Sequence, residues 1–170
     1  HIWIGTFRGL NKNNVHDYHQ YFCTDDSLGL PDNQITHLLR DSKNRFWVGT
    51  VNGVCLYTDK DNFRIIPIEA DNKNVRQILE DRNGRIFLNT GFQLYAYHPR
   101  EEKITCVLPE ISPGNAFYAQ CHIAPDNNLW VMTSTGLRCY DPSTLQLKES
   151  VALSGYPYYS YLHNNELWIT

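Results

Sequence analysis

The sequence has 170 residues, of which 42% are hydrophobic and 13% aromatic, which is enough for one domain with a sizeable core. The formal net charge of -3 at pH 7 argues against binding of nucleic acid through its phosphates. No apolar run approaches the roughly 18 residues that a membrane helix needs. Many aromatic residues, with 10 Gly and 8 Pro, favour short strands joined by tight turns.

A short phrase recurs along the chain: an apolar residue, an aromatic residue, another apolar residue, and Thr shortly afterwards. The aromatic members are Trp3, Trp47, Phe87, Trp130 and Trp168. Their spacing defines a repeat of about 40–45 residues, a period typical of propeller blades.

Each copy of the repeat is expected to hold four strands separated by polar or glycine-containing turns. In chain order the expected strands are 2–6, 10–13 and 18–23; 35–39, 46–50, 54–57 and 63–68; 75–79, 86–90, 94–97 and 104–108; 118–123, 129–133, 137–140 and 145–153; 158–162 and 167–170. No segment shows a helical apolar period of useful length.

This pattern predicts an all-β fold, a β-propeller of four-stranded antiparallel blades. Residues 1–170 are expected to form one partial propeller, an arc of about four blades. A closed four-blade ring would duplicate the second strand of one blade, so we expect an arc of a larger ring with six to eight blades. The chain starts at His1 and stops in an apolar run, and we expect the remaining blades of the same chain to cover its ends.

The second copy contains the most characteristic sequence motif of the repeat. Its sequence reads Gly-Leu-Pro-Asp-Asn-Gln-Ile over 29–35 and Phe-Trp-Val-Gly-Thr over 46–50. This resembles the two-component regulator propeller repeat, and the resemblance extends over essentially all 170 residues. It is weaker in the third and fourth copies, where Asn89 and Met132 replace the glycine of the phrase.

The resemblance implies the periplasmic sensor region of a hybrid two-component regulator, with seven-bladed propellers. It implies binding of an oligosaccharide signal, relay through a homodimer to a distant histidine kinase, and no catalysis by this segment. We also expect no cofactor, no direct nucleic-acid binding by this segment, and contact with the membrane only through the parent chain. Five Cys without a Cys-x-x-Cys motif would alone favour a reducing compartment, whereas the resemblance implies the periplasm.

Two sets of loops are expected on one face of the ring, where propellers commonly hold a ligand at the central channel. One set joins the second strand to the third, and the other joins successive blades. Amides, Arg and Tyr suit the hydroxyls and ring faces of a carbohydrate. The candidate ligand-binding residues are Arg8, Asn33, Gln34, Asn52, Asn74, Arg76, Gln93, Tyr158 and Tyr159.

Other polar and aromatic positions are expected to be structural. The repeated aromatic residue should fill the space between blades. An inner-strand column of His37, Gln77 and Gln120 should bond to channel water or backbone. The turns that start with Thr should need Gly at a positive φ, and Gln93 in place of that Gly predicts a reshaped turn. No residues have the spacing of a metal site or catalytic triad, so we expect no metal.

Two other classes of function stay open. A protein–protein scaffold is compatible with the fold, although the Gly-His and Trp-Asp signatures of WD-repeat propellers are not in the sequence. A propeller lyase or lactonase would need His, Tyr and Arg, or a metal, converging on the channel.

Overall fold

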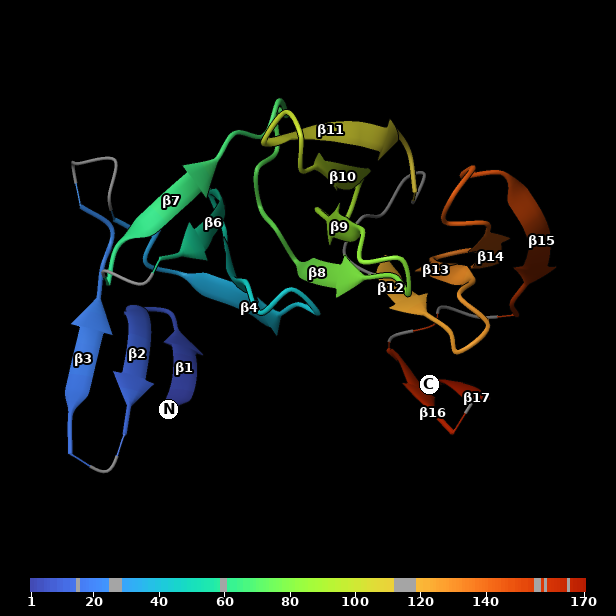
Figure 1. The fold of residues 1–170 in the computed structure, drawn as a ribbon. Coiled ribbons are helices and arrows are strands. Elements are labelled where there is room, and N and C mark those ends of the chain that lie inside the picture. Colours follow the sequence, from blue (N-terminus) through green and yellow to red (C-terminus); the bar gives the residue numbers. More distant parts are fainter. Residues whose placement is uncertain are drawn as a thin grey trace.

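The computed structural model describes residues 1–14, 16–24, 29–58, 61–111, 119–154, 157, 159–164 and 166–170. In these residues every strand belongs to an antiparallel β-sheet, and five such sheets are arranged around an arc (Figure 1). No helix in this part of the chain is long and apolar enough to cross a membrane. The predicted all-β propeller of four-stranded blades is confirmed.

The five sheets follow the chain in order, and within each sheet consecutive strands are neighbours. The first holds β1 (Ile2–Thr6), β2 (Gly9–Asn13) and β3 (Tyr18–Tyr21); the second β4 (Ile35–Arg40), β5 (Phe46–Thr50), β6 (Gly53–Tyr57) and β7 (Phe63–Ile66); the third β8 (Gln77–Glu80), β9 (Ile86–Asn89), β10 (Leu94–His98) and β11 (Lys103–Leu108); the fourth β12 (Gln120–Ile123), β13 (Leu129–Thr133), β14 (Gly136–Tyr140) and β15 (Leu147–Ala152); the fifth β16 (Ser160–His163) and β17 (Glu166–Ile169). The predicted order of three, four, four, four and two strands is therefore correct.

The first strand of each complete blade lies on the inside of the arc and the fourth strand lies on the outside (Figure 1). Neighbouring blades meet along these inner strands, because β4 contacts β8, β8 contacts β12, and β12 contacts β16.

Three inner strands, β8, β12 and β16, begin later than the sequence predicts. In the third blade, pairing starts at Gln77 rather than at Val75. The reason is that the Val75 N–H donates to the Thr50 carbonyl of the preceding blade at 3.0 Å. Residues 75–76 are thus a lead-in segment between two blades, and residue 119 stands in the same place before β12.

The repeated aromatic residue packs against the Tyr at the end of the third strand in the next blade. Trp3 meets Tyr57 and Trp47 meets Tyr97, each with ring centroids 4.9 Å apart in an edge-on arrangement. Trp47 is fully buried. The predicted position between blades is confirmed for these rings.

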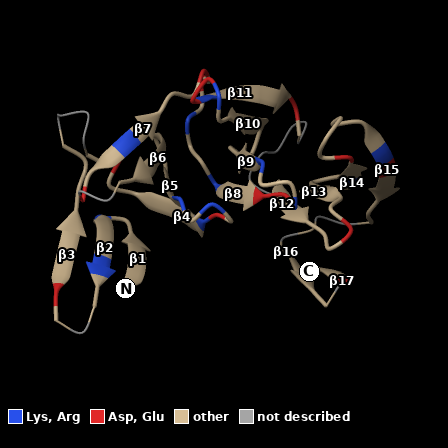
Figure 2. Cartoon of the chain, in the orientation of Figure 1, with Lys and Arg blue, Asp and Glu red and all other residues tan. Residues whose placement is uncertain are grey.

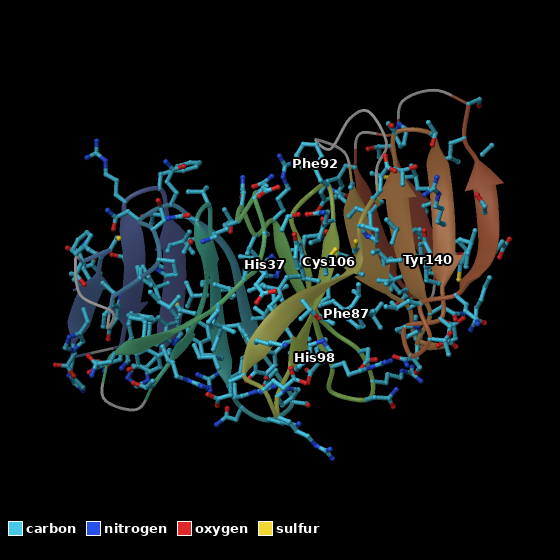
Figure 3. The ribbon with its side chains drawn as sticks, turned by 90° about the horizontal axis from the view of Figure 1, so that it is seen from above. His37, Phe87, Phe92, His98, Cys106 and Tyr140 are labelled. Atoms are coloured by element: carbon cyan, nitrogen blue, oxygen red, sulfur yellow. The ribbon has the colours of Figure 1, made fainter. Side chains whose placement is uncertain are left out.

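Phe87 and Tyr140 occupy the corresponding positions in the third and fourth blades and belong to one core cluster (Figure 3). Trp168, in the two-stranded fifth sheet, is 51% exposed. A buried position was expected there as well and is not found in this structure. The difference arises because burial of this ring needs a third strand in the following blade.

Two of the turns that follow inner strands are fixed by a buried carboxylate. Asp41 Oδ2 accepts from Arg45 Nε at 2.6 Å and from Trp47 Nε1 at 2.8 Å, and Asp81 Oδ2 accepts from Arg85 Nε at 2.7 Å. Burial alone would raise the pKa of Asp41, but the hydrogen bonds from Trp47 and Arg45 outweigh it and hold that pKa below its usual value. These turns lie at the end of the blades away from the lead-in segments.

The turns between second and third strands explain the repeated Thr and Gly. Thr50 Oγ1 donates to the Gly53 carbonyl at 3.0 Å, and Gly53 has a φ of +130°. In the third blade the positive φ moves to Gly91, at +92°. Gln93 then adopts an ordinary φ and its Oε1 accepts from the Tyr95 hydroxyl at 2.5 Å, so this turn is reshaped as predicted.

Candidate functional site

A pocket of about 590 Å³ lies at the inside of the arc, where the chain enters the inner strands. It is lined by Phe7, Ile35, Thr36, His37, Asn74, Arg76, Gln77, Ala119, Gln120 and Tyr159. All five sheets, with their lead-in segments and turns, contribute to it. We call it the inner-strand pocket; its volume falls in the range typical of small-ligand sites.

A β-bulge shapes one wall of the pocket. Ile35 pairs with Thr50 and His37 pairs with Gly49, so Thr36 is an extra residue in β4. The Thr36 hydroxyl donates to the Val75 carbonyl in the lead-in segment of the next blade. Bulges of this kind re-aim side chains and are common beside functional sites.

The side chain of Gln77 fastens the third blade to the fourth. Its Oε1 accepts from the Cys121 N–H at 2.9 Å and from Asn89 Nδ2 at 2.8 Å. Asn89 also donates to the Ala119 carbonyl at 3.0 Å. Gln77 therefore contacts the backbone of the next blade, one of the two roles predicted for the inner-strand polar column.

Gln120 makes the equivalent connection from the fourth blade to the fifth. Its Oε1 accepts from the Ser160 N–H at 2.7 Å and from the Ser160 hydroxyl at 3.0 Å. His122 Nε2 also lies 2.8 Å from that hydroxyl. The two Gln carboxamides thus set the spacing of the inner strands.

His37 occupies the position in its blade that Gln77 and Gln120 occupy in theirs, but its side chain is an imidazole. Burial lowers the pKa of its imidazole below the usual 6.5, so the ring is neutral at pH 7. Figure 3 places it on β4, between the two ends of the blade stack. A neutral imidazole can donate and accept one hydrogen bond each.

Three of the predicted ligand residues meet in the pocket: Asn74, Arg76 and Tyr159. Asn74 Oδ1 is buried and has no hydrogen-bond partner among the residues that the structure describes. Tyr159 is 56% exposed, so its ring is accessible at the rim. Their role as ligand contacts stays a prediction, and Tyr158 lies outside the described residues.

The other predicted residues do not line this pocket, and their recorded bonds support the fold. Asn33 Oδ1 accepts from the Cys23 N–H at 2.7 Å, and the Gln34 carbonyl accepts from the Val51 N–H at 3.2 Å. The backbone N–H groups of Arg8 and Asn52 donate to the Thr hydroxyls of their own turns. Gln93 bonds to Tyr95, as described above.

Phe7 was not among the candidate ligand residues, yet it lines the pocket and is 82% exposed. A large exposed apolar ring in a loop beside a pocket suits contact with a ligand. Its position next to the candidate Arg8 in the same turn could have indicated this from the sequence. Ala119 was not predicted, because a small apolar side chain has no functional group that would indicate a binding role.

The described residues offer little support for a metal site or for a reactive cysteine. In that part of the chain no group of three or more His, Cys, Asp or Glu is placed to hold a metal ion. The cysteines are free thiols, and burial raises the pKa of Cys121 to about 12. The buried thiols, those of Cys55, Cys121 and Cys139, are therefore protonated and unreactive.

Blades of four antiparallel strands, joined through their inner strands around a common centre, define an arc of a β-propeller. The family model for the two component regulator propeller matches residues 29–52, the segment that leads into and includes the first two strands of the second blade. Residues 29–52 therefore match one copy of this propeller repeat. No curated protein matches the sequence.

Solved structures with the same fold include two extracellular domains from B. thetaiotaomicron, both described as belonging to hybrid two component systems. The domain of BT4673 superposes with a TM-score of 0.78 at 21% identity, and that of BT3049 with 0.74 at 23% identity; each match covers 98% of this chain and 24% of the other. Virginiamycin B lyase from Staphylococcus aureus superposes with a TM-score of 0.73 at 19% identity, over 98% of this chain and 58% of the lyase. The chain thus spans about a quarter of the length of the extracellular domains, and at these identities the likeness shows the fold.

Proposed function

We propose that this chain is part of the extracytoplasmic sensor region of a hybrid two-component regulator and binds an oligosaccharide in the inner-strand pocket. The observation that carries the proposal is the convergence of five sheets on one pocket, in a chain that holds the regulator propeller repeat. The likeness to extracellular domains of hybrid two component systems supports the sensor role and a periplasmic location. The segment itself performs no catalysis and passes its signal through a homodimer to a distant kinase.

The composition of the pocket supports a carbohydrate ligand. Phe7 and Tyr159 offer accessible aromatic rings at the rim, and Asn74 and Arg76 offer polar groups deeper in the lead-in segment. Small-ligand sites typically combine apolar surface with a few placed polar groups. Gln77 and Gln120 already bond to neighbouring blades, so they form the wall that holds these groups.

Isothermal titration of the full-length protein against a panel of oligosaccharides tests the proposal. Phe7→Ala should weaken binding of the sugar that binds by at least about fivefold, the effect of losing about 1 kcal/mol of contact. Phe92→Ala is the matched control, since Phe92 occupies the corresponding turn two blades further on, is 50% exposed and does not line the pocket. Absence of heat and of thermal stabilisation with every sugar would refute the sensor proposal.

A propeller lyase is the second candidate function. His37, Arg76 and Tyr159 line the same pocket, and this is the set of residue types that the enzyme alternative requires. A neutral His serves as a base and Tyr as an acid in proton transfer. Incubating the protein with acidic polysaccharides and following the unsaturated products by ultraviolet absorbance distinguishes the two: the sensor binds without product formation.

A further inference from the structure

The carboxamide of Gln120 is held in one orientation by the fifth sheet. Its Oε1 accepts from the N–H and from the hydroxyl of Ser160, at 2.7 and 3.0 Å. Because these two bonds fix the oxygen, the Nε2 group of Gln120 is left as a donor. In the described part of the chain this Nε2 has no acceptor, whereas Nε2 of Gln77 donates to the Cys121 carbonyl at 3.4 Å. Gln120 is partly exposed and lines the inner-strand pocket, so the pocket offers a ligand an oriented donor.

The carboxamide of Asn74, in the lead-in segment of the neighbouring third blade, is not fixed in this way. The backbone is anchored, because the Asn74 N–H donates to Asn72 Oδ1 at 3.0 Å. The side-chain Oδ1 of Asn74 is buried and has no hydrogen-bond partner among the described residues, a state that is unfavourable for an acceptor. Since Asn74 lines the same pocket, rotation of its carboxamide brings Oδ1 to a ligand that carries an N–H donor.

The pocket also combines apolar surface with a lack of carboxylates. Charged residues of both signs are spread along the arc (Figure 2), but none of the ten described residues that line the pocket is Asp or Glu. Carboxylates accept hydrogen bonds and so suit the hydroxyl donors of an unsubstituted sugar. Ile35 and Ala119 instead add aliphatic surface, and Phe7 and Tyr159 add exposed rings. The lining therefore suits a sugar that carries an amide and a methyl group in place of a hydroxyl.

We infer that the inner-strand pocket binds an N-acetylated amino sugar, whose acetamido carbonyl accepts from Gln120 Nε2 and whose acetamido N–H donates to Asn74 Oδ1. This inference rests on the proposed function and specifies its ligand. An acetamido group supplies an acceptor, a donor and a methyl group together, and the two hydrogen bonds use the groups that the fold leaves without partners. The methyl group packs against Ala119, where burial of apolar surface is favourable. Phe7 and Tyr159 contact the apolar face of the sugar ring.

The test uses pairs of sugars that differ only in whether C2 carries an acetamido group or a hydroxyl. N-acetyllactosamine is compared with lactose, and triacetylchitotriose with cellotriose, by isothermal titration of the full-length protein. We expect at least one acetamido member to bind about tenfold or more tightly than its hydroxyl counterpart, the effect of two additional neutral hydrogen bonds. The two pairs keep the same linkage within each comparison, so a difference in affinity reports the acetamido group.

Variants then locate the acetamido group. Gln120→Glu keeps the oxygen that accepts from Ser160 but replaces the donor nitrogen by a carboxylate oxygen, which repels the acetamido carbonyl and accepts from a hydroxyl. It should reduce the preference for the acetamido sugar by about fivefold or more. Gln146→Glu is the control with the same charge change, because Gln146 is exposed just before β15 on the outside of the arc. Asn74→Ala should weaken binding of the acetamido sugar by about threefold or more and that of its counterpart by less. Circular dichroism confirms that each variant is folded.

The outcomes separate this inference from the proposed function. Equal affinity within both pairs, or an acetamido preference that Gln120→Glu leaves unchanged, overturns the inference and leaves an oligosaccharide sensor. Binding of other sugars but of neither acetamido member has the same meaning. Failure of every sugar to bind overturns both the inference and the proposed function. If Gln120→Glu does not fold, the matched sugars and Asn74→Ala decide, and a preference that is unchanged in Asn74→Ala then overturns the inference.

Discussion

Replacing Trp47 by Phe tests how two blades are held together. The Trp47 Nε1 donates to Asp41 Oδ2 at 2.8 Å, and its buried ring packs edge-on against Tyr97. Phe keeps a ring of the kind that the third blade uses at Phe87 but removes the donor. Hydrogen bonds to charged groups contribute about 1.5–3 kcal/mol. We therefore expect Trp47→Phe to lower the free energy of unfolding by about 2 kcal/mol at pH 7, and Trp47→Ala by about 3–5 kcal/mol.

Urea denaturation followed by far-ultraviolet circular dichroism measures this loss without relying on tryptophan fluorescence. A double-mutant cycle with Asp41→Ala isolates the Trp47–Asp41 interaction and should give a coupling of about 1 kcal/mol or more. Trp168→Phe, at the same register but with a ring that is 51% exposed, should change stability by less than about 0.5 kcal/mol. Additive effects of the Trp47 and Asp41 substitutions would refute the reasoning.

Three further predictions concern the inner strands and the contacts between blades. Gln77→Leu deprives the buried Cys121 N–H of its acceptor and should lower the free energy of unfolding by about 1–3 kcal/mol; an unchanged urea midpoint would contradict this. Gly49→Ala places a Cβ 3.1 Å from Val75 Cγ1 and 3.3 Å from Ile78 Cδ1 and should lower the melting temperature through an overpacking cost of about 1–3 kcal/mol, whereas an unaltered melting temperature would show that these side chains move aside freely. Burial lowers the pKa values of His37 and His122, so the unfolded chain takes up protons first as pH falls. The free energy of unfolding should accordingly decline from about pH 6.5 down to the folded-state pKa values, by at most about 1.4 kcal/mol per pH unit for each histidine. His37→Gln should make that decline shallower in urea titrations at several pH values. The same pH dependence in the variant and the unmodified protein would contradict a lowered pKa at His37.

The fold could be predicted from the sequence because its packing contacts recur at a fixed interval. Trp3 and Trp47 meet the next blade in the same way, so the packing requirement recurs with the repeat. What the repeat did not indicate was where each inner strand begins. The sequence pattern does not show to which of two blades Val75 belongs.

The candidate site could be predicted only in part. Chemistry alone selected amides, Arg and Tyr in the loops of one face, but turns also use amides to satisfy their own backbone. Asn33 illustrates this, because its side-chain oxygen accepts from the Cys23 N–H. Phe7 lies in the loops of the same face but was not selected as a candidate, because the sequence does not show whether an aromatic ring is packed or exposed.

The residues just before the inner strands offer a criterion that was present in the sequence. Aligned on the following turn, three copies hold Thr36, Arg76 and Ala119 at one position, and all three line the inner-strand pocket. Packing between blades demands the same kind of residue in every copy, as the recurring Trp or Phe shows. A single ligand at the centre of the arc touches each blade at a different point and imposes no such uniformity. A position of the repeat that holds a different type of residue in each copy is therefore expected to face a ligand, whereas a position that holds the same type is expected to pack between blades.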